Sequence, residues 1–304
     1  MSRRSAVLAW LLLVTVMLPL ATAAAQDGRR LRIACYNVEN LFDVFDDPYT
    51  QDERTDVKPR EQVEALAAAI RRVDADVVAL CEVEQEGLLR AMVYEFLPQM
   101  GYEYIAAGDT NSAHGIRLGV ISRYPIARLA SYRFRRLRLE GDPRTWRFAR
   151  DLTHATIQLS DGLSLELFAA HFKSKLDSAD DPQSAHWRLA EATAARQIID
   201  ELLNQNPQAL VALVGDLNDS PDSPPLSKLL AGGRLLDAHA SLPASQRITY
   251  LRKPFRGTID YVLVSPALAA KQVPGSARVL DDPALLAGSD HAPIVAEFDL
   301  GTER

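Results

Sequence analysis

The apolar run at residues 209–214, which leads directly into Gly215, constrains the fold of this chain more than any other segment. An apolar run of this length next to a glycine predicts a buried strand. Residues two apart in a strand point to the same side, so Asp216 and Asn218 are expected to face one spot at its carboxyl end. A carboxylate that accepts a proton, beside an amide that donates to a developing oxyanion, can activate water. Taken alone, the segment fits equally well a polar turn whose Asp and Asn side chains bond the backbone.

Other predicted strands also end or begin at polar residues of complementary chemistry. The apolar runs at 31–36, 76–81 and 163–170 each lead into such a residue, and two later runs each follow one. Ligand sites in sheet proteins gather where strand ends converge, so these side chains predict a single cleft. They are Asn37, Glu82, His171, Asp260 and the segment Ser289, Asp290 and His291.

Together with Arg150, and in this order, these residues resemble the signature of the endonuclease/exonuclease/phosphatase superfamily, which has the deoxyribonuclease-I-like fold. The resemblance extends over residues 31–299, and segments 36–43 and 171–175 are most similar to secreted bacterial members with nuclease activity. It implies an α/β fold of the four-layer α/β/β/α sandwich type. Fold analogy by itself does not assign a substrate.

Hydrophobic periodicity agrees with two sheets packed face to face and helices outside. The predicted helices span 59–72, 87–97 and 184–204. Besides the runs at 31–36 and 76–81, strands are predicted at 102–106, 117–122, 127–139, 148–159, 164–170, 210–214, 258–264, 277–280 and 293–298.

The resemblance assigns a metal site to Asn37, Glu82 and Asp290. Hard oxygen ligands suit Mg²⁺ or Mn²⁺, and Mg²⁺ usually keeps several waters while binding one or two protein carboxylates. We therefore expect Mg²⁺ as the cofactor, with Mn²⁺ as the alternative. Such an ion neutralises phosphate oxygens and polarises phosphorus for attack.

Five residues are expected to be catalytic: His171, Asp216, Asn218, Asp260 and His291. The resemblance pairs Asp260 with His291, so that the carboxylate fixes the tautomer of the imidazole. Either Asp216 or His291 takes the proton from water, and we favour Asp216. His171 is expected to bind the scissile phosphate or to protonate the leaving oxygen.

Two arginines are candidates for binding substrate phosphate. Arg150 matches a family position with this role, and a solvated surface cation is the alternative. Arg117 is a weaker candidate, because its segment, Gly115 to Gly119, departs from the Arg-Gly order of many relatives.

Two other chemistries are excluded. Ser289, Asp290 and His291 do not form a serine triad, because adjacent strand residues alternate faces and no Gly-x-Ser-x-Gly turn occurs in the sequence. A zinc site would need clustered His or Cys at short spacing, which the sequence lacks.

The first 25 residues have the order of a secretory signal peptide: Arg3 and Arg4, an apolar stretch, then small residues. The apolar stretch is short for a membrane span. We expect cleavage after Ala25, a secreted or periplasmic protein, and no stable membrane insertion; an uncleaved anchor is the alternative. Residues 26–304 then form one domain, because no linker or repeat interrupts them.

The formal charge of −6 becomes −8 when Arg3 and Arg4 are removed. An acidic protein has no global attraction to nucleic acid, so polyanion binding would need local basic patches. One lies between residues 133 and 150, and the other comprises Arg247, Arg252, Lys253 and Arg256.

The chain has two cysteines, Cys35 and Cys81. Strand alternation places Cys35 on the side of Asn37 but Cys81 on the side opposite Glu82. We therefore expect two buried free thiols.

The sequence thus predicts an exported, Mg²⁺-dependent phosphodiesterase, acting as a monomer, that hydrolyses nucleic acid by direct attack of water. The alternative on the same fold is a phosphatase or lipid head-group phosphodiesterase, such as one acting on sphingomyelin or inositol phosphates. Few tryptophans speak against the lipid reaction, since only Trp146 and Trp187 follow the signal segment. A non-catalytic binding protein would have lost a site residue, and none is lost.

Overall fold

The structure is a computed structural model that describes residues 29–178, 180–283 and 286–301. The predicted signal peptide, residues 1–25, lies outside them. Within the described ranges, no helix is long and apolar enough to cross a membrane.

The first sheet consists of β1 (Arg30–Leu41), β2 (Val77–Val83), β3 (Tyr104–Ala107), β4 (Arg117–Ser122), β11 (Arg278–Val279) and β12 (Ile294–Asp299). Its strand order is β11, β12, β1, β2, β4, β3. The central pair β1 and β2 is parallel, so both strands end at one edge of the sheet.

The second sheet consists of β5 (Ile126–Ser131), β6 (Leu152–Ser160), β7 (Leu163–His171), β8 (Leu210–Asp216), β9 (Leu236–Asp237) and β10 (Asp260–Val264). Its strand order is β5, β6, β7, β8, β10, β9. Here β7 and β8 are the parallel pair, and β10 runs antiparallel to β8. The end of β8 therefore lies beside the start of β10.

The helices are α1 (Arg60–Val73), α2 (Glu86–Phe96), α3 (Ala185–Gln205), α4 (Pro224–Leu230) and α5 (Pro266–Ala269). Short 3-10 turns occupy Asp52–Arg54, Pro182–Ser184, Ala231–Gly233 and Ala244–Gln246. The apolar face of α1, with Leu66 and Ile70, packs on the outer face of the first sheet together with α2. The buried side of α3, with Ala190 and Ile199, packs on the second sheet together with α4.

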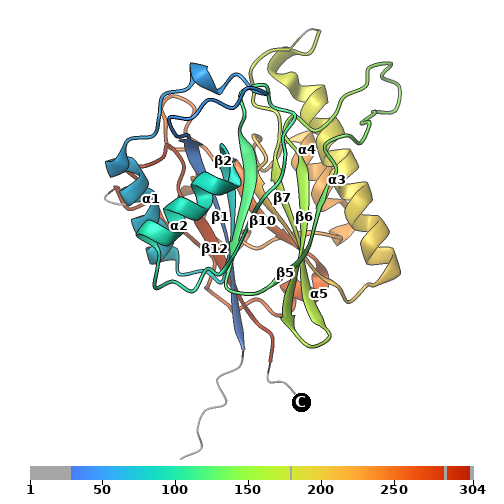
Figure 1. The fold of residues 1–304 in the computed structure, drawn as a ribbon. Coiled ribbons are helices and arrows are strands. Elements are labelled where there is room, and N and C mark those ends of the chain that lie inside the picture. The colour runs from blue at the N-terminus through green and yellow to red at the C-terminus, as the bar shows by residue number, and fades with distance from the viewer. Residues whose placement is uncertain (1–28, 179, 284–285, 302–304) are drawn as a thin grey trace, which may run out of the picture.

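A third apolar core fills the space between the two sheets. The layers therefore follow the order helix, sheet, sheet, helix, as Figure 1 shows with α1 and α2 on one side and α3 and α4 on the other. The predicted α/β/β/α sandwich is confirmed.

Both cysteines are free and buried, but the alternation argument for them was wrong. Cys35 and Cys81 lie in the same inter-sheet core. The reason is a bulge at Glu82, which is skipped in the pairing between Cys81 and Val83 and has a positive φ of 67°. One extra residue in a strand reverses its alternation.

Two expected strands were also wrong in part, and two short helices were missed. The strand expected at 127–139 ends at Ser131, and the strand expected at 148–159 begins only at Leu152. Residues 132–151 leave the sheet with one bridge, Leu137 to Trp146. At this exit the backbone N–H of Tyr132 is shared between the carbonyl of Leu152 in β6 at 3.2 Å and the carboxylate of Asp151 at 2.9 Å. The short helices α4 and α5 were missed, although each begins with a Ser-Pro pair whose serine caps the helix.

Candidate active site

The polar side chains at three strand ends lie on the same strand face as the residues of the inter-sheet core. In β7, β8 and β10 the core residues Ala169, Val214 and Val262 each lie two positions from a polar residue. Those polar residues are His171, Asp216 and Asp260. Because alternate residues of a strand share a face, all three point between the sheets where the apolar core ends.

Strand register aligns these three residues. Asp216 pairs with His171 of β7 on one side and with Asp260 of β10 on the other. The glycine before Asp216 permits this close pairing, since a Cβ at Gly215 would lie 1.8 Å from the carbonyl oxygen of Ala170. The glycine that follows the predicted apolar run is therefore required for a steric reason.

Glu82 reaches the same place from the first sheet through the bulge in β2. Its Oε1 accepts a hydrogen bond from the side-chain amide of Asn37 at 3.1 Å. Its Oε2 accepts one from the backbone N–H of Asn40 at 3.0 Å. Bulges re-aim side chains beside functional sites. This bulge turns the carboxylate toward the cleft.

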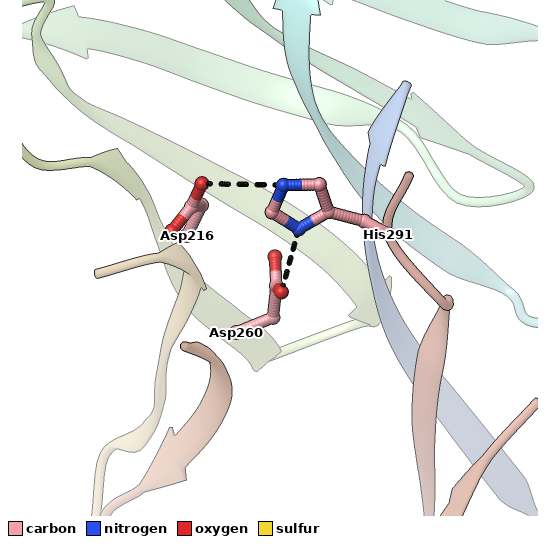
Figure 2. Close-up of side chains that lie close together, drawn as sticks. All are labelled: Asp216, Asp260 and His291. Atoms are coloured by element: carbon pink, nitrogen blue, oxygen red, sulfur yellow. Dashed lines mark hydrogen bonds and ion pairs between the residues drawn. The ribbon is translucent and has the colours of Figure 1, made fainter. Parts of the chain in front are cut away.

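His291 and Asp260 form the predicted pair. Nδ1 of His291 lies 2.8 Å from Oδ2 of Asp260. The other ring nitrogen, Nε2, faces Oδ2 of Asp216 at 3.9 Å, as Figure 2 shows. Ser289 fixes this segment, because its hydroxyl donates to the carbonyl of Asn37 and accepts the N–H of His291.

His171 faces Asp216 from the opposite side. Its Nε2 lies 3.6 Å from Oδ2 of Asp216 and 3.8 Å from Oε1 of Glu82. The amide nitrogen of Asn37 lies 3.1 Å from the same Asp216 oxygen. In this geometry Asn37 donates to both carboxylates and orients them, whereas the predicted metal contact would require its amide oxygen.

Burial and local charge give the two histidines opposite ionisation states. Burial, with the charges of Arg150 and His291, lowers the pKa of His171 well below its ordinary value. Burial also opposes charge on His291, but the charge of Asp260 and its hydrogen bond raise the pKa of His291 to about 10. His171 is therefore neutral and His291 is a cation at neutral pH.

Burial raises the pKa of Asp216 to about 7, and the charge of Asp260 contributes further. A base with a pKa near the working pH combines basicity with a useful ionised fraction. Asp216 therefore has the properties of a proton acceptor.

The donor set fits a hard divalent cation. Asp216, Asp260 and His291 each have a potential ligand atom within 4.8 Å of the others, but the His291 cation cannot coordinate a metal. The carboxylates of Glu82 and Asp290 add oxygen donors at 18% and 17% side-chain exposure, enough for a hydrated ion to reach. Glu82 and Asp290 are the residues that would hold a metal there.

Arg150 and Asn218 meet at one carbonyl. Arg150 Nη1 and Asn218 Nδ2 both donate to the carbonyl of Phe172, each at 3.0 Å. Asn218 has a positive φ of 53°, so it lies in a turn and not on an extended strand. The sequence fitted either a strand end or a polar turn at 216–218, and the structure has both: Asp216 ends the strand, and Asn218 belongs to the turn.

Arg117 is not with this cluster. Its guanidinium donates to Asp47 at 3.0 Å, to the carbonyl of Gly115 at 3.2 Å and to the carbonyl of Glu84. These contacts fasten the loop before α1 to the start of β4 and to the residue after β2, so the geometry does not support the predicted contact with substrate phosphate. Arg247 of the second predicted basic patch also binds within the protein, because it forms an ion pair with Asp237.

Two residues beside the site, the partly exposed Tyr250 and the buried Glu191, were missed at the sequence level. The Tyr250 ring lies against His291, with ring centroids 5.0 Å apart. Glu191 of α3 is fully buried and accepts the backbone N–H groups of Ala149 and Lys173, which fastens the segments that carry Arg150 and His171. Glu191 could have been found from the sequence, because it is a glutamate on the apolar side of a predicted helix. No sequence signal indicated Tyr250.

An open groove adjoins the metal-binding side of the cluster. It has a volume of about 610 Å³ and is polar, with both acids and cations in its wall. The lining includes Glu39, Asn40, Lys58, His114 and Asp290. Asp290 thus connects the groove to the catalytic cluster.

Comparison with known proteins agrees with this geometry. A model of the Endonuclease/Exonuclease/phosphatase family matches residues 32–261. Among curated proteins, no significant match was found.

Solved structures share the fold at low sequence identity. Truncated Caenorhabditis elegans TDP2 is 18% identical, with 89% of this chain and 97% of that chain covered and a TM-score of 0.61. The human Nocturnin catalytic domain with bound sulfate is 17% identical, with 88% and 94% covered and a TM-score of 0.62. SmcL is 18% identical, with 89% and 99% covered and a TM-score of 0.62.

Proposed function

Because the chain belongs to the endonuclease/exonuclease/phosphatase family, we propose that it is an exported, Mg²⁺-dependent phosphodiesterase that hydrolyses nucleic acid. Members of this family are metal-dependent phosphoric ester hydrolases, and the enzyme class predicted from the sequence is confirmed. The identity of the metal, the substrate and export are parts of the proposal.

One observation carries the proposed mechanism: a carboxylate poised to titrate near pH 7 lies between a neutral and a cationic histidine. Asp216 accepts a proton from water as the water oxygen bonds to phosphorus and the bond from phosphorus to the leaving oxygen breaks. The His291 cation, held by Asp260, stabilises the added negative charge on the phosphoryl oxygens. His171, being neutral, offers an N–H to the phosphate and is a poor proton donor to the leaving oxygen.

A bound Mg²⁺ would neutralise phosphate charge from the side of Glu82 and Asp290. Arg150 would support the same phosphate, since its charge acts on His171 and its Nε has no hydrogen-bond partner among the described residues. Direct attack of water on phosphorus requires no covalent intermediate, and the Ser289 hydroxyl beside the site is already held by the carbonyl of Asn37.

Two basic segments beside the site support a polynucleotide substrate. The loop that ends at Arg150 exposes Arg136, Arg138 and Arg147, and Arg147 lies over the exposed ring of Phe134. On the metal-binding side, Arg252 forms ion pairs with Glu39 and Asp290. Cations interleaved with exposed aromatic rings suit phosphates and unstacked bases.

A lipid head-group substrate is the second candidate, and one observation favours it. Val44, Phe45 and Tyr49 are strongly exposed on the loop before α1, at 74%, 73% and 93%. Exposed apolar side chains on one loop are typical of surfaces that contact membranes or partners. The sequence argument against a lipid substrate considered only tryptophans and therefore overlooked these three exposed side chains.

The decisive experiment uses purified protein with Mg²⁺ and compares plasmid DNA, RNA, bis-p-nitrophenyl phosphate, p-nitrophenyl phosphate and sphingomyelin vesicles. The proposal expects cleavage of a polynucleotide and of the diester, and loss of both with EDTA. Turnover of the monoester or the vesicles alone would replace it with the second candidate. Export is tested separately, by fractionating cells that express residues 1–304 and sequencing the mature N-terminus.

A further inference from the structure

A small cavity lies behind the carboxylate of Asp260. Its Oδ2 holds His291 Nδ1, whereas its Oδ1 is buried and has no hydrogen-bond partner in the part of the chain that the structure describes. An orphan oxygen on a buried carboxylate costs free energy unless water or another donor reaches it.

Two further orphan atoms belong to residues around the same cavity. Arg247 Nε and His239 Nδ1 are buried and also lack partners among the described residues. Asp260, Arg247 and His239 all line this cavity, which has a volume of about 10 Å³. Three orphan polar groups around one small space point to a shared ligand.

The chemistry of the three atoms matches one water molecule. His239 Nε2 lies 3.3 Å from the carbonyl of Arg278, which places the ring hydrogen on Nε2 and leaves Nδ1 as an acceptor. Burial lowers the pKa of His239, which keeps the ring neutral. Arg247 Nε–H donates, and Asp260 Oδ1 accepts.

A water can donate to the two acceptors and accept from the one donor. Thr249, which also lines the cavity, has a hydroxyl oxygen that accepts the N–H groups of Ile259 and Asp260, so its own hydrogen can complete the shell. The cavity has about the volume that one buried water needs, and three hydrogen bonds are typical for such a water.

Arg247 is itself held in place. It forms an ion pair with Asp237, whose side chain also accepts the backbone N–H of His239. Asp237 ends β9, which pairs with β10, the strand that begins at Asp260. The arginine, the histidine and the carboxylate therefore belong to one rigid corner of the second sheet.

We propose that Arg247 is a positioning residue for the pair of Asp260 and His291, acting through one buried water that it shares with His239. The inference rests on the proposed function, because it needs Asp260 and His291 to serve turnover. The water fixes the plane of the carboxylate, so that Oδ2 stays in line with the His291 ring.

The test compares Arg247→Lys with wild type on bis-p-nitrophenyl phosphate at saturating Mg²⁺. Lysine keeps the charge beside Asp237 but has no Nε–H for the cavity. We expect kcat to fall about tenfold, the lower end for residues that orient a site from behind, with KM within twofold. Arg234→Lys is the matched control, since Arg234 also pairs with an aspartate, Asp200, outside the site.

A double mutant separates the inference from the proposed function. If Arg247 acts through Asp260, adding Arg247→Lys to Asp260→Asn causes no further loss. Wild-type kcat in Arg247→Lys, or losses that multiply in the double mutant, overturns the inference while Asp260→Asn alone still shows a reduced but measurable kcat. Wild-type turnover in Asp260→Asn overturns the proposed function instead.

One measurement needs no variant and covers the case in which Arg247→Lys does not fold. A high-resolution crystal structure of the wild-type protein should show an ordered water within hydrogen-bond distance of Asp260 Oδ1, Arg247 Nε and His239 Nδ1. Direct contact of these side chains without a water, or a water that misses Asp260, overturns the inference.

Discussion

Nδ1 of His291 lies 2.8 Å from Oδ2 of Asp260, and this contact joins the two sheets of the sandwich. Asp260 begins β10 of the second sheet, whereas His291 lies three residues before Ile294, the first residue of β12 in the first sheet. The pair exists only when the sheets pack together. Catalysis and the inter-sheet core are thus linked by geometry.

His291→Ala and Asp260→Asn should behave as one functional unit. If Asp260 acts by orienting and charging His291, the double mutant will be little slower than His291→Ala, because coupled catalytic residues are strongly non-additive. The measurement is kcat/KM for the four proteins of the cycle. Rate losses that multiply would show independent roles.

Glu82→Gln should lower turnover by about 10² to 10⁴-fold, the size of other electrostatic catalytic effects. The change removes a ligand charge at nearly constant volume, so the thermal midpoint should change little. Glu86→Gln is the control, since Glu86 pairs with Arg90 at the start of α2. Metal titration of the activity should shift only for Glu82→Gln, and activity within threefold of wild type contradicts the metal assignment.

Neutralising Arg136, Arg138 and Arg147 should weaken polynucleotide binding and flatten its salt dependence. Each lost phosphate contact on duplex DNA lowers the slope of log K against log salt by about 0.9. Hydrolysis of bis-p-nitrophenyl phosphate should not change. As a control, alanine at Arg72, Arg128 and Arg278 removes the same charge from exposed positions outside this loop. Equal effects of the two triple mutants on binding and on its salt dependence would refute a specific role for the loop.

The free energy of unfolding should depend on pH through Glu191. Burial raises the pKa of Glu191 from 4.5 to about 7, although two backbone N–H groups and nearby arginines oppose this. Because the folded-state pKa is raised, the contribution to stability is complete below pH 4.5 and is lost as pH rises through 7. At about 1.4 kcal/mol per pKa unit, the loss is about 3 kcal/mol. Urea unfolding of wild type and Glu191→Gln should show curves that diverge over this range; parallel curves contradict the assignment.

Cys35 and Cys81 should remain thiols. Both are at most 1% exposed, so native protein should react slowly with a thiol reagent, whereas denatured protein without reductant should label at two sites. Protection of both sites in denaturant, reversed by reductant, would show a disulfide.

The sequence pattern was sufficient to predict the helices and strands whose buried faces pack against an apolar core along their whole length. The helix expected at 59–72 is α1, and the strand expected at 117–122 is β4, because each has one face or both faces in an apolar core. The pattern failed at 132–139, where arginines interspersed with tyrosine, phenylalanine and leucine imitate a strand but the chain leaves the sheet. Periodicity reports which side chains are apolar, and it does not report whether a neighbouring strand is there to pair with.

By itself the sequence determined which polar residues adjoin the apolar runs of the strands, although it placed the end of β1 too early, since β1 continues beyond Asn37 to Leu41. It therefore supplied Asn37, Glu82, His171, Asp216, Asp260 and His291 as members of one site. Only the tertiary structure decided how they act. The bulge that turns Glu82, the register that aligns Asp216 with His171 and Asp260, and the burial that separates the two histidine pKa values all arise from contacts between distant segments. Desolvation and Coulomb interactions depend on distances in space, and those distances are set when the two sheets pack.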